Sequence, residues 1–181
     1  MSILEFLGFG SNPPAARDES ETATVRKIVD ELDHMEPERA RFVAAFAYIL
    51  SRVARADMHI SDEETRSMQR IVAEQGQLPA EQAIIVVQMA KTQNLLFGGT
   101  ENYLVAKEFN RLASREQKLS MLHCLFAVGA ADDSISTTEN NVVRQIADEL
   151  DLEHADFIAV RSRFRQHLAV LKDASPADEN S

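Results

Sequence analysis

Apolar side chains recur along the chain at the spacing of one face of an α-helix. From residue 21 onward they fall three or four positions apart, and no segment alternates apolar and polar residues as a half-buried strand does. The strand-like run AIIVVQMA, at 83–90, follows a proline suited to a first helical turn and fits a helix better. The clearest helical spacing is shown by Val25, Ile28, Val29 and Leu32, and then by Phe42, Phe46, Ile49, Leu50 and Val53. The sequence therefore predicts an all-α protein.

Three serines mark helix starts. Each opens the pattern Ser-x-x-Glu/Gln, a capping box in which the serine and the side chain three residues later each bond to the other residue's backbone N–H. The pairs are Ser61 with Glu64, Ser114 with Gln117, and Ser136 with Glu139, while Pro37 and Pro79 suit the first turns of two more helices. We predict a single-domain bundle of about eight helices, near 22–34, 37–56, 61–76, 79–91, 101–111, 114–130, 136–150 and 153–172.

The two ends of the chain differ in composition from the part between them. The start, MSILEFLGFG, is apolar but lacks the basic region and cleavage site of a secretory signal, and GSNPPAARDES after it resembles a linker. The last residues, DASPADENS, are polar and contain proline, as disordered tails do. We expect an apolar segment and linker at 1–20, a helical domain at 21–172 and a disordered tail at 173–181.

One motif occurs twice. ADMHISDEE, at 56–64, returns 75 positions later as ADDSISTTE, and at the same offset Leu50 matches Leu125. Each copy comprises a helix, a turn and a second helix, and one such hairpin cannot bury its apolar stripe alone. We therefore expect two pseudo-symmetric helix-turn-helix halves that pack together, at about 37–91 and 101–172.

Each copy keeps an Asp and a Glu seven positions apart. Glu64 and Glu139 fall in the first turn of a helix, where the partial positive charge favours a carboxylate. Asp57 and Asp132 follow the last turn of the preceding helix, where the dipole disfavours one. An aspartate there can close a turn by accepting a hydrogen bond from a nearby backbone N–H, which needs no ligand. In this interpretation the pairs only shape turns.

The alternative interpretation is a metal site shared by both turns. Four carboxylates that converge repel one another unless they are protonated or neutralised, and Ca²⁺ or Mg²⁺ suits such oxygen ligands better than Zn²⁺. The spacing differs from that of an EF-hand loop. The candidate ligands are Asp57, Glu64, Asp132 and Glu139, with His59 and Asp133 as auxiliaries. Both interpretations stay open on the residues alone.

Composition argues against a nucleic-acid partner and for a reducing compartment. Lys and Arg total 19 against 29 acidic residues, and the net charge of −10 opposes nucleic-acid binding. Cys124 is the only cysteine, so no disulfide can form within the chain and we expect a cytoplasmic protein. Its neighbour His123 points about 100° away around the helix, so we expect a core cysteine and no nucleophile pair. No run reaches the roughly 20 apolar residues of a membrane-spanning helix.

The stretch RSRFRQH, at 161–167, is the one basic cluster in this acidic chain. It could dock an acidic partner or anionic lipid, or it could be a solvated face that pairs with the chain's own acidic surface. Peripheral membrane contact through this helix or through the apolar N-terminal segment is a further possibility. We expect a protein partner.

The stretch from about Arg41 to Phe164 resembles the tellurite-resistance TerB-like family. The resemblance rests on RVARADMHISDEE, on FAVGAADDSISTTEN and on the following RQIADELDLEHADF. It implies an all-helical domain with two pseudo-symmetric halves and a metal site formed by the acidic residues of both turns, which carries over to Asp57, Glu64, Asp132 and Glu139. The family's usual Gly after the Asp is Met58 in one copy and Asp133 in the other, which implies a different loop shape.

These observations favour a non-catalytic protein. The sequence offers no Ser/His/Asp set, HExxH or CxxC motif. The resemblance implies a cation-binding or protein-interaction module, linked to tellurite or general stress response. One alternative is a purely structural scaffold for a protein partner, and a second is a metal-assisted hydrolase that uses the carboxylates.

Overall fold

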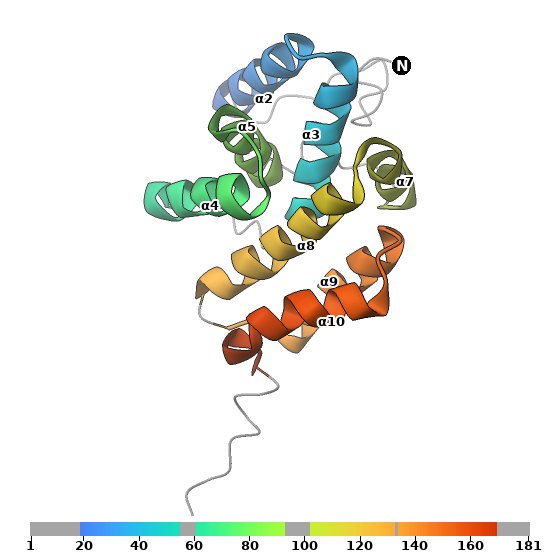
Figure 1. Ribbon diagram of the computed structural model, residues 1–181. Helices are drawn as coiled ribbons and strands as arrows, with labels where there is room; N and C mark the ends of the chain where they lie inside the picture. Colours follow the sequence, from blue (N-terminus) through green and yellow to red (C-terminus); the bar gives the residue numbers. More distant parts are fainter. Residues whose placement is uncertain (1–18, 55–60, 93–101, 133, 170–181) are drawn as a thin grey trace, which may run out of the picture.

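The protein is an all-α single domain, as predicted. The computed structural model describes residues 19–54, 61–92, 102–132 and 134–169 (Figure 1). The α-helices of these residues are α2 (Glu19–Asp33), α3 (Pro37–Ser51), α4 (Asp62–Gln75), α5 (Ala80–Lys91), α7 (Asn102–Leu112), α8 (Arg115–Gly129), α9 (Thr137–Glu149) and α10 (His154–Arg163). Two 3-10 helices, η1 (Ala130–Asp132) and η2 (Arg165–His167), follow α8 and α10. Within the described ranges no helix is long and apolar enough to cross a membrane.

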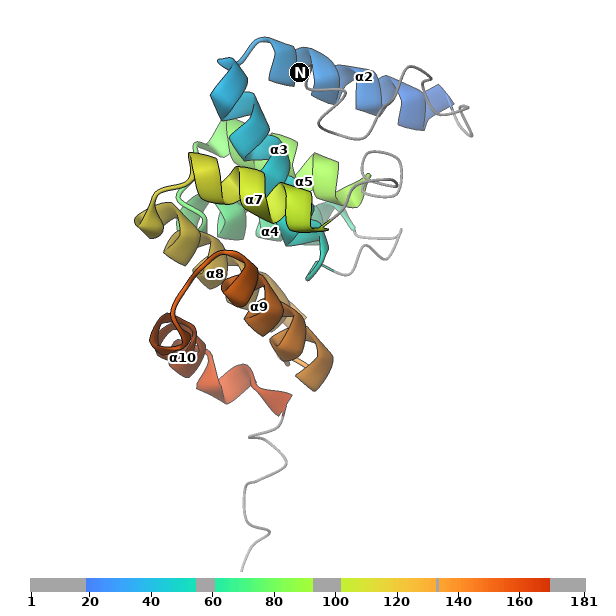
Figure 2. The same cartoon turned by 90° about the vertical axis from the view of Figure 1, so that its right-hand side faces the viewer.

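Helix α8 crosses the middle of the molecule. In Figure 1 the helices α2, α3, α4, α5 and α7 lie above it and α9 and α10 lie below it, and Figure 2 shows the same separation from the side. α3 packs against α5 and α7, α4 packs against α5 and α8, and α9 and α10 pack against α8 and against each other. α8 therefore joins the upper group of helices to the lower pair.

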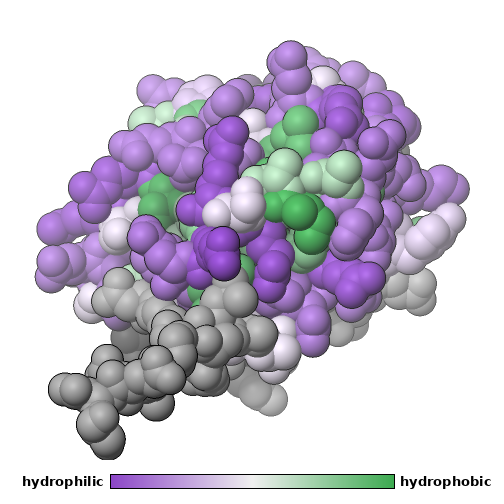
Figure 3. Space-filling view, turned by 60° about the horizontal axis from the view of Figure 1, so that its bottom comes forward, coloured by the Kyte–Doolittle hydropathy of each residue, from purple (hydrophilic) through white to green (hydrophobic). Residues whose placement is uncertain are grey.

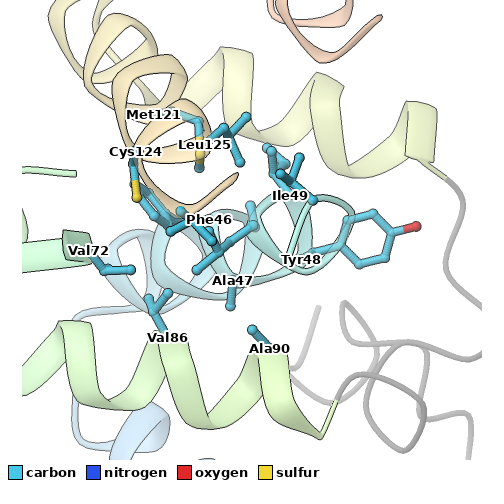
Figure 4. Close-up of a cluster of buried hydrophobic side chains, with 14 of the residues drawn as sticks. Phe46, Ala47, Tyr48, Ile49, Val72, Val86, Ala90, Met121, Cys124 and Leu125 are labelled. Carbon is cyan, nitrogen blue, oxygen red and sulfur yellow. The ribbon is translucent and has the colours of Figure 1, made fainter. Parts of the chain in front are cut away.

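The core forms where α3, α4, α5 and α8 meet (Figure 4). α3 is buried all round, because every residue from 42 to 51 is buried. A helix that is apolar on every side is stable only when other helices surround it, as they do here. The fully buried residues include Phe46 and Ile49 of α3, Val72 of α4, Val86 of α5, and Met121, Cys124 and Leu125 of α8. The expected core residues are confirmed as buried, with Val25 and Val29 only partly so.

Positions matched by the internal repeat have similar environments. Leu50 and Leu125 are both completely buried, and Val53 and Val128 are 4% and 8% exposed. Each pair belongs to the last turn or the end of the helix that precedes a copy of the motif. The two-fold relation between the halves stays a prediction.

The last helix is shorter than the predicted range 153–172. α10 ends at Arg163, and the chain continues through η2 to Leu168, which has extended backbone angles and forms an isolated parallel bridge with Ile135. The backbone N–H of Ile135 donates to His167 O at 2.6 Å, and the N–H of Ala169 donates to Ile135 O at 3.0 Å. The prediction extended the helix too far because Leu168 continues the apolar spacing. Leu168 is indeed buried, at 2% exposed, but it is not helical.

Candidate functional site

Two capping boxes begin the helices that follow the two copies of the motif. At the start of α4, the backbone N–H and the hydroxyl of Ser61 both donate to Glu64 Oε2 at 2.7 Å, and the Glu64 N–H donates to Ser61 Oγ at 3.2 Å. At the start of α9, Ser136 donates to Glu139 Oε2 at 2.8 and 2.6 Å, and the Glu139 N–H returns the bond at 3.2 Å. The predicted boxes are confirmed, including the third at Ser114 and Gln117.

The capping bonds also set the charge of Glu64. Hydrogen bonds from the Ser61 hydroxyl and from the Ser61 backbone N–H stabilise the ionised carboxylate and lower the pKa of Glu64. Glu64 is therefore negatively charged at neutral pH. In both boxes the capping bonds are accepted by Oε2 of the glutamate.

The helix ends that precede the two turns lie side by side. Gly129 is the last residue of α8, and a Cβ built on it would lie 3.9 Å from Val53 Cγ1, just beyond the end of α3, and 3.7 Å from Ile135 Cγ1. These distances are ordinary van der Waals contacts. The described residues just before the two copies of the motif, Val53 and Gly129, are thus close in space.

The structure describes only part of the predicted ligand set. Glu64 and Glu139 lie in the first turns of α4 and α9, and Asp132 is the last residue of η1. The side chain of Asp132 falls outside the described residues, as do Asp57, Met58, His59 and Asp133. Within the described part of the chain, no three His, Cys, Asp or Glu side chains form a group that could hold a metal ion. The convergence of the four carboxylates stays a prediction.

The second turn is fixed from two sides. The backbone of Ile135 is paired with the chain after η2, and its side chain is 2% exposed beside Gly129. Because Ile135 stands only three residues after Asp132, this pairing restricts where the second copy of the motif can run. This bridge could not be predicted from the sequence, since a single pair of residues leaves no periodic pattern.

A salt bridge joins the end of α3 to the end of α9. The guanidinium of Arg52 donates to both carboxylate oxygens of Glu149, at 2.5 and 3.1 Å, and the two side chains are only 11% and 21% exposed. Gln145 donates to the same carboxylate at 2.9 Å, and Asn110 donates to the Glu149 carbonyl at 2.9 Å. Arg52 is adjacent to Val53, so this network holds the end of α3 against the end of α9. The partners lie 97 residues apart, and nothing in the sequence pairs them.

Cys124 and His123 do not form a reactive pair. Cys124 is completely buried, and burial raises the pKa of its thiol to about 12. Burial, and then the charge of Arg163, lower the pKa of His123. A thiol that stays protonated is a poor nucleophile, and the prediction of a core cysteine is confirmed.

Comparison with known families gives one match. Residues 42–162, about two thirds of the chain, match the sequence model of the family described as tellurite resistance protein TerB. Comparison with curated proteins and with solved structures gives no match. The matched range runs from α3 through α10 and contains both copies of the motif. The chain belongs to the TerB family.

Proposed function

We propose that this TerB-family chain is a non-catalytic module that holds one divalent cation between its two turns. The observation that supports the proposal is the proximity of Val53, just beyond α3, to Gly129 at the end of α8, since a Cβ built on Gly129 would lie 3.9 Å from Val53 Cγ1. Asp57 and Asp132 follow these two helix ends within a few residues. The proposed ligands are Asp57, Glu64, Asp132 and Glu139.

The chemistry of the donor set fits a hard cation. All four proposed ligands are carboxylates, which Ca²⁺ and Mg²⁺ prefer. A proton is a poor means of relieving their repulsion, because the bonds from Ser61 lower the pKa of Glu64 and favour its ionised form. A bound cation supplies the missing positive charge, and its role in this proposal is to hold the two turns together.

The wider role follows the family. We propose a protein partner, a cytoplasmic location and a part in tellurite or general stress response, with residues 1–20 as a further contact for a partner or a membrane surface. The description of the matched family supports the link to tellurite.

A structural scaffold is the second candidate. One observation favours it: the capping boxes account for Glu64 and Glu139 without any ligand. In that case only the two aspartates need another explanation, and an Asx-type turn would provide it.

Thermal unfolding of the full chain separates the two candidates. The chain is freed of metal with a chelator and then titrated with Ca²⁺, Mg²⁺, Mn²⁺ or Zn²⁺. The double variant of the turns carries Asp57→Asn and Asp132→Asn, and the control double variant carries Asp30→Asn and Asp33→Asn. Asp30 and Asp33 are exposed on α2, so the control makes the same change of charge away from the turns. A cation at a hundredfold excess over its Kd stabilises the parent and the control by about 2.7 kcal/mol. The scaffold is favoured if no cation raises the midpoint, or if the turn variant keeps the rise.

A further inference from the structure

A second surface of the molecule is rich in positive charge. The segment from Phe157 to Lys172 contains three Arg, one His and one Lys but no Asp or Glu, although acidic residues outnumber basic ones 29 to 19 in the whole chain. The arginines are at 161 and 163 in α10 and at 165 in η2. This surface takes no part in the proposed cation site.

The chain's own carboxylates do not neutralise these arginines in the described ranges. The ion pairs found there are made by Arg41, Arg52, Arg111 and Arg115. Arg161 instead donates from Nε to the amide oxygen Oδ1 of Asn140 at 2.9 Å. The alternative that this cluster pairs with the chain's own acidic surface therefore has no support in this part of the structure.

An exposed apolar side chain lies beside the charges. α9 and α10 pack against each other, and Asn140 of α9 accepts the hydrogen bond from Arg161 of α10. One turn further along α9 is Arg144, which is exposed, and one turn back along α10 is Ile158, which is 44% exposed. Figure 3 shows this lower side of the molecule, where apolar side chains lie among hydrophilic ones. We define the basic face as Arg144, Ile158, Arg161 and Arg165.

We propose that the basic face binds a short acidic segment of a partner protein, with one apolar side chain of that segment on Ile158 and its carboxylates toward the arginines. Guanidinium groups suit this role because their planar fork donates two parallel hydrogen bonds to a carboxylate. An apolar centre with a charged rim is also the usual anatomy of a protein interface.

The overall charge favours a short peptide over an anionic membrane. A membrane presents negative charge across the whole footprint of a domain whose net charge is −10. A short segment is influenced mainly by the charges within a Debye length, about 8 Å at physiological salt. Recruitment to anionic lipid also takes clusters of roughly four to eight basic residues, more than the three arginines of this face.

Fluorescence anisotropy of a labelled peptide tests the proposal on the full chain. The peptide has about ten residues, Asp and Glu around a central Leu, and the buffer holds about 0.15 M salt so that long-range charge is screened. The double variant of the basic face carries R144E and R165E. The control double variant carries R66E and R70E, which make the same change of charge at exposed positions on α4. Thermal unfolding checks that each variant folds, and R144Q with R165Q replaces the reversal if it does not.

The proposal expects saturable binding that R144E with R165E weakens at least about tenfold, as loss of close charge pairs does. R66E with R70E stays within about twofold, and Ile158→Ser or a Ser in place of the central Leu weakens binding severalfold, since each removes the apolar contact. No saturable binding, or equal losses in both double variants, overturns it. So does retention on phosphatidylserine vesicles without peptide binding, which assigns the face to a membrane. Peptide binding that appears only after residues 173–181 are removed assigns it to the chain's own acidic end.

Discussion

Val53 and Gly129, 76 positions apart in the chain, bring the ends of α3 and α8 together. A Cβ on Gly129 would lie 3.9 Å from Val53 Cγ1, and in the sequence each copy of the motif starts two or three residues after one of these two positions. This proximity brings together the described residues that precede the two copies of the motif. A cation shared by both turns requires this arrangement.

Gly129→Ala should stabilise the protein. The built Cβ meets only ordinary contacts, at 3.7 and 3.9 Å, and alanine is the better residue in a helix by about 0.5–1 kcal/mol. Urea unfolding measures the free energy change. A loss of stability would mean that the two helix ends approach more closely than described.

Gly76→Ala should have the opposite effect. At this position, just after α4, the built Cβ would lie 2.8 Å from Phe46 Cζ and 2.5 Å from the Val72 carbonyl oxygen. Phe46 is fully buried and cannot move aside easily, so we expect a loss of about 1–3 kcal/mol in the free energy of unfolding. Gly129→Ala is the matched control in the same urea experiment, and equal effects of the two substitutions would contradict the packing described.

Ser61→Ala and Ser136→Ala test whether the glutamates serve only as caps. Each substitution removes one helix cap and should lower stability by about 1 kcal/mol. The stabilisation by cation should persist, because the proposed ligands remain. Thermal unfolding with and without cation reports both the stability lost with the cap and the stabilisation by cation. If the stabilisation by cation vanished when either serine was replaced, capping and cation binding by the glutamates would not be separate roles.

Arg52→Met should destabilise the fold more than most surface changes. The substitution keeps an apolar stem but leaves the Glu149 carboxylate, 21% exposed, without its guanidinium partner. Hydrogen bonds to charged groups contribute about 1.5–3 kcal/mol, so we expect a loss of about 2 kcal/mol by urea unfolding. Arg111→Met is the control, since Arg111 pairs with Glu38 and Glu108 but is 49% exposed. Equal losses would show that burial does not strengthen the Arg52 pair.

His123 should make stability depend on pH. Burial and the charge of Arg163 lower its pKa in the folded state, so below its ordinary value of about 6.5 the unfolded chain binds more protons. Its contribution to stability is present in full above that pH and is lost as the pH falls through the lowered pKa. His123→Gln should remove this part of the decline, measured as the difference between parent and variant in urea unfolding between about pH 5 and pH 7. If the free energy of unfolding of parent and variant changed equally with pH, His123 would make no such contribution.

The helices and their starts could be predicted because local rules determine them. The apolar period and the serine caps at Ser61, Ser114 and Ser136 act within a few residues, and each is found where expected. The predicted end of α10 was wrong because Leu168 forms a bridge with Ile135, more than thirty residues away, in place of helical hydrogen bonds. Asp151, with a φ of 55° after α9, likewise had no local signal.

The candidate site was less accessible to prediction. The motif identified four acidic residues, but their placement depends on tertiary contacts such as Val53 with Gly129 and Arg52 with Glu149. Burial and ion pairing across distant segments leave no pattern in one sequence. The arginine cluster at 161–167 was visible, whereas its neighbours Arg144 and Ile158 could be found only from the α9 and α10 pair.

Isothermal titration of the metal-free chain with Ca²⁺ or Mg²⁺ tests the shared site most directly. The parent, Asp57→Asn alone, Asp132→Asn alone and the Asp30→Asn control are titrated under the same conditions. A site built from both turns predicts one cation per chain, and it predicts that either turn substitution weakens binding by at least about tenfold, as loss of a charged ligand does. Two cations per chain, or a single turn substitution that leaves one site at its original affinity, would contradict a shared site.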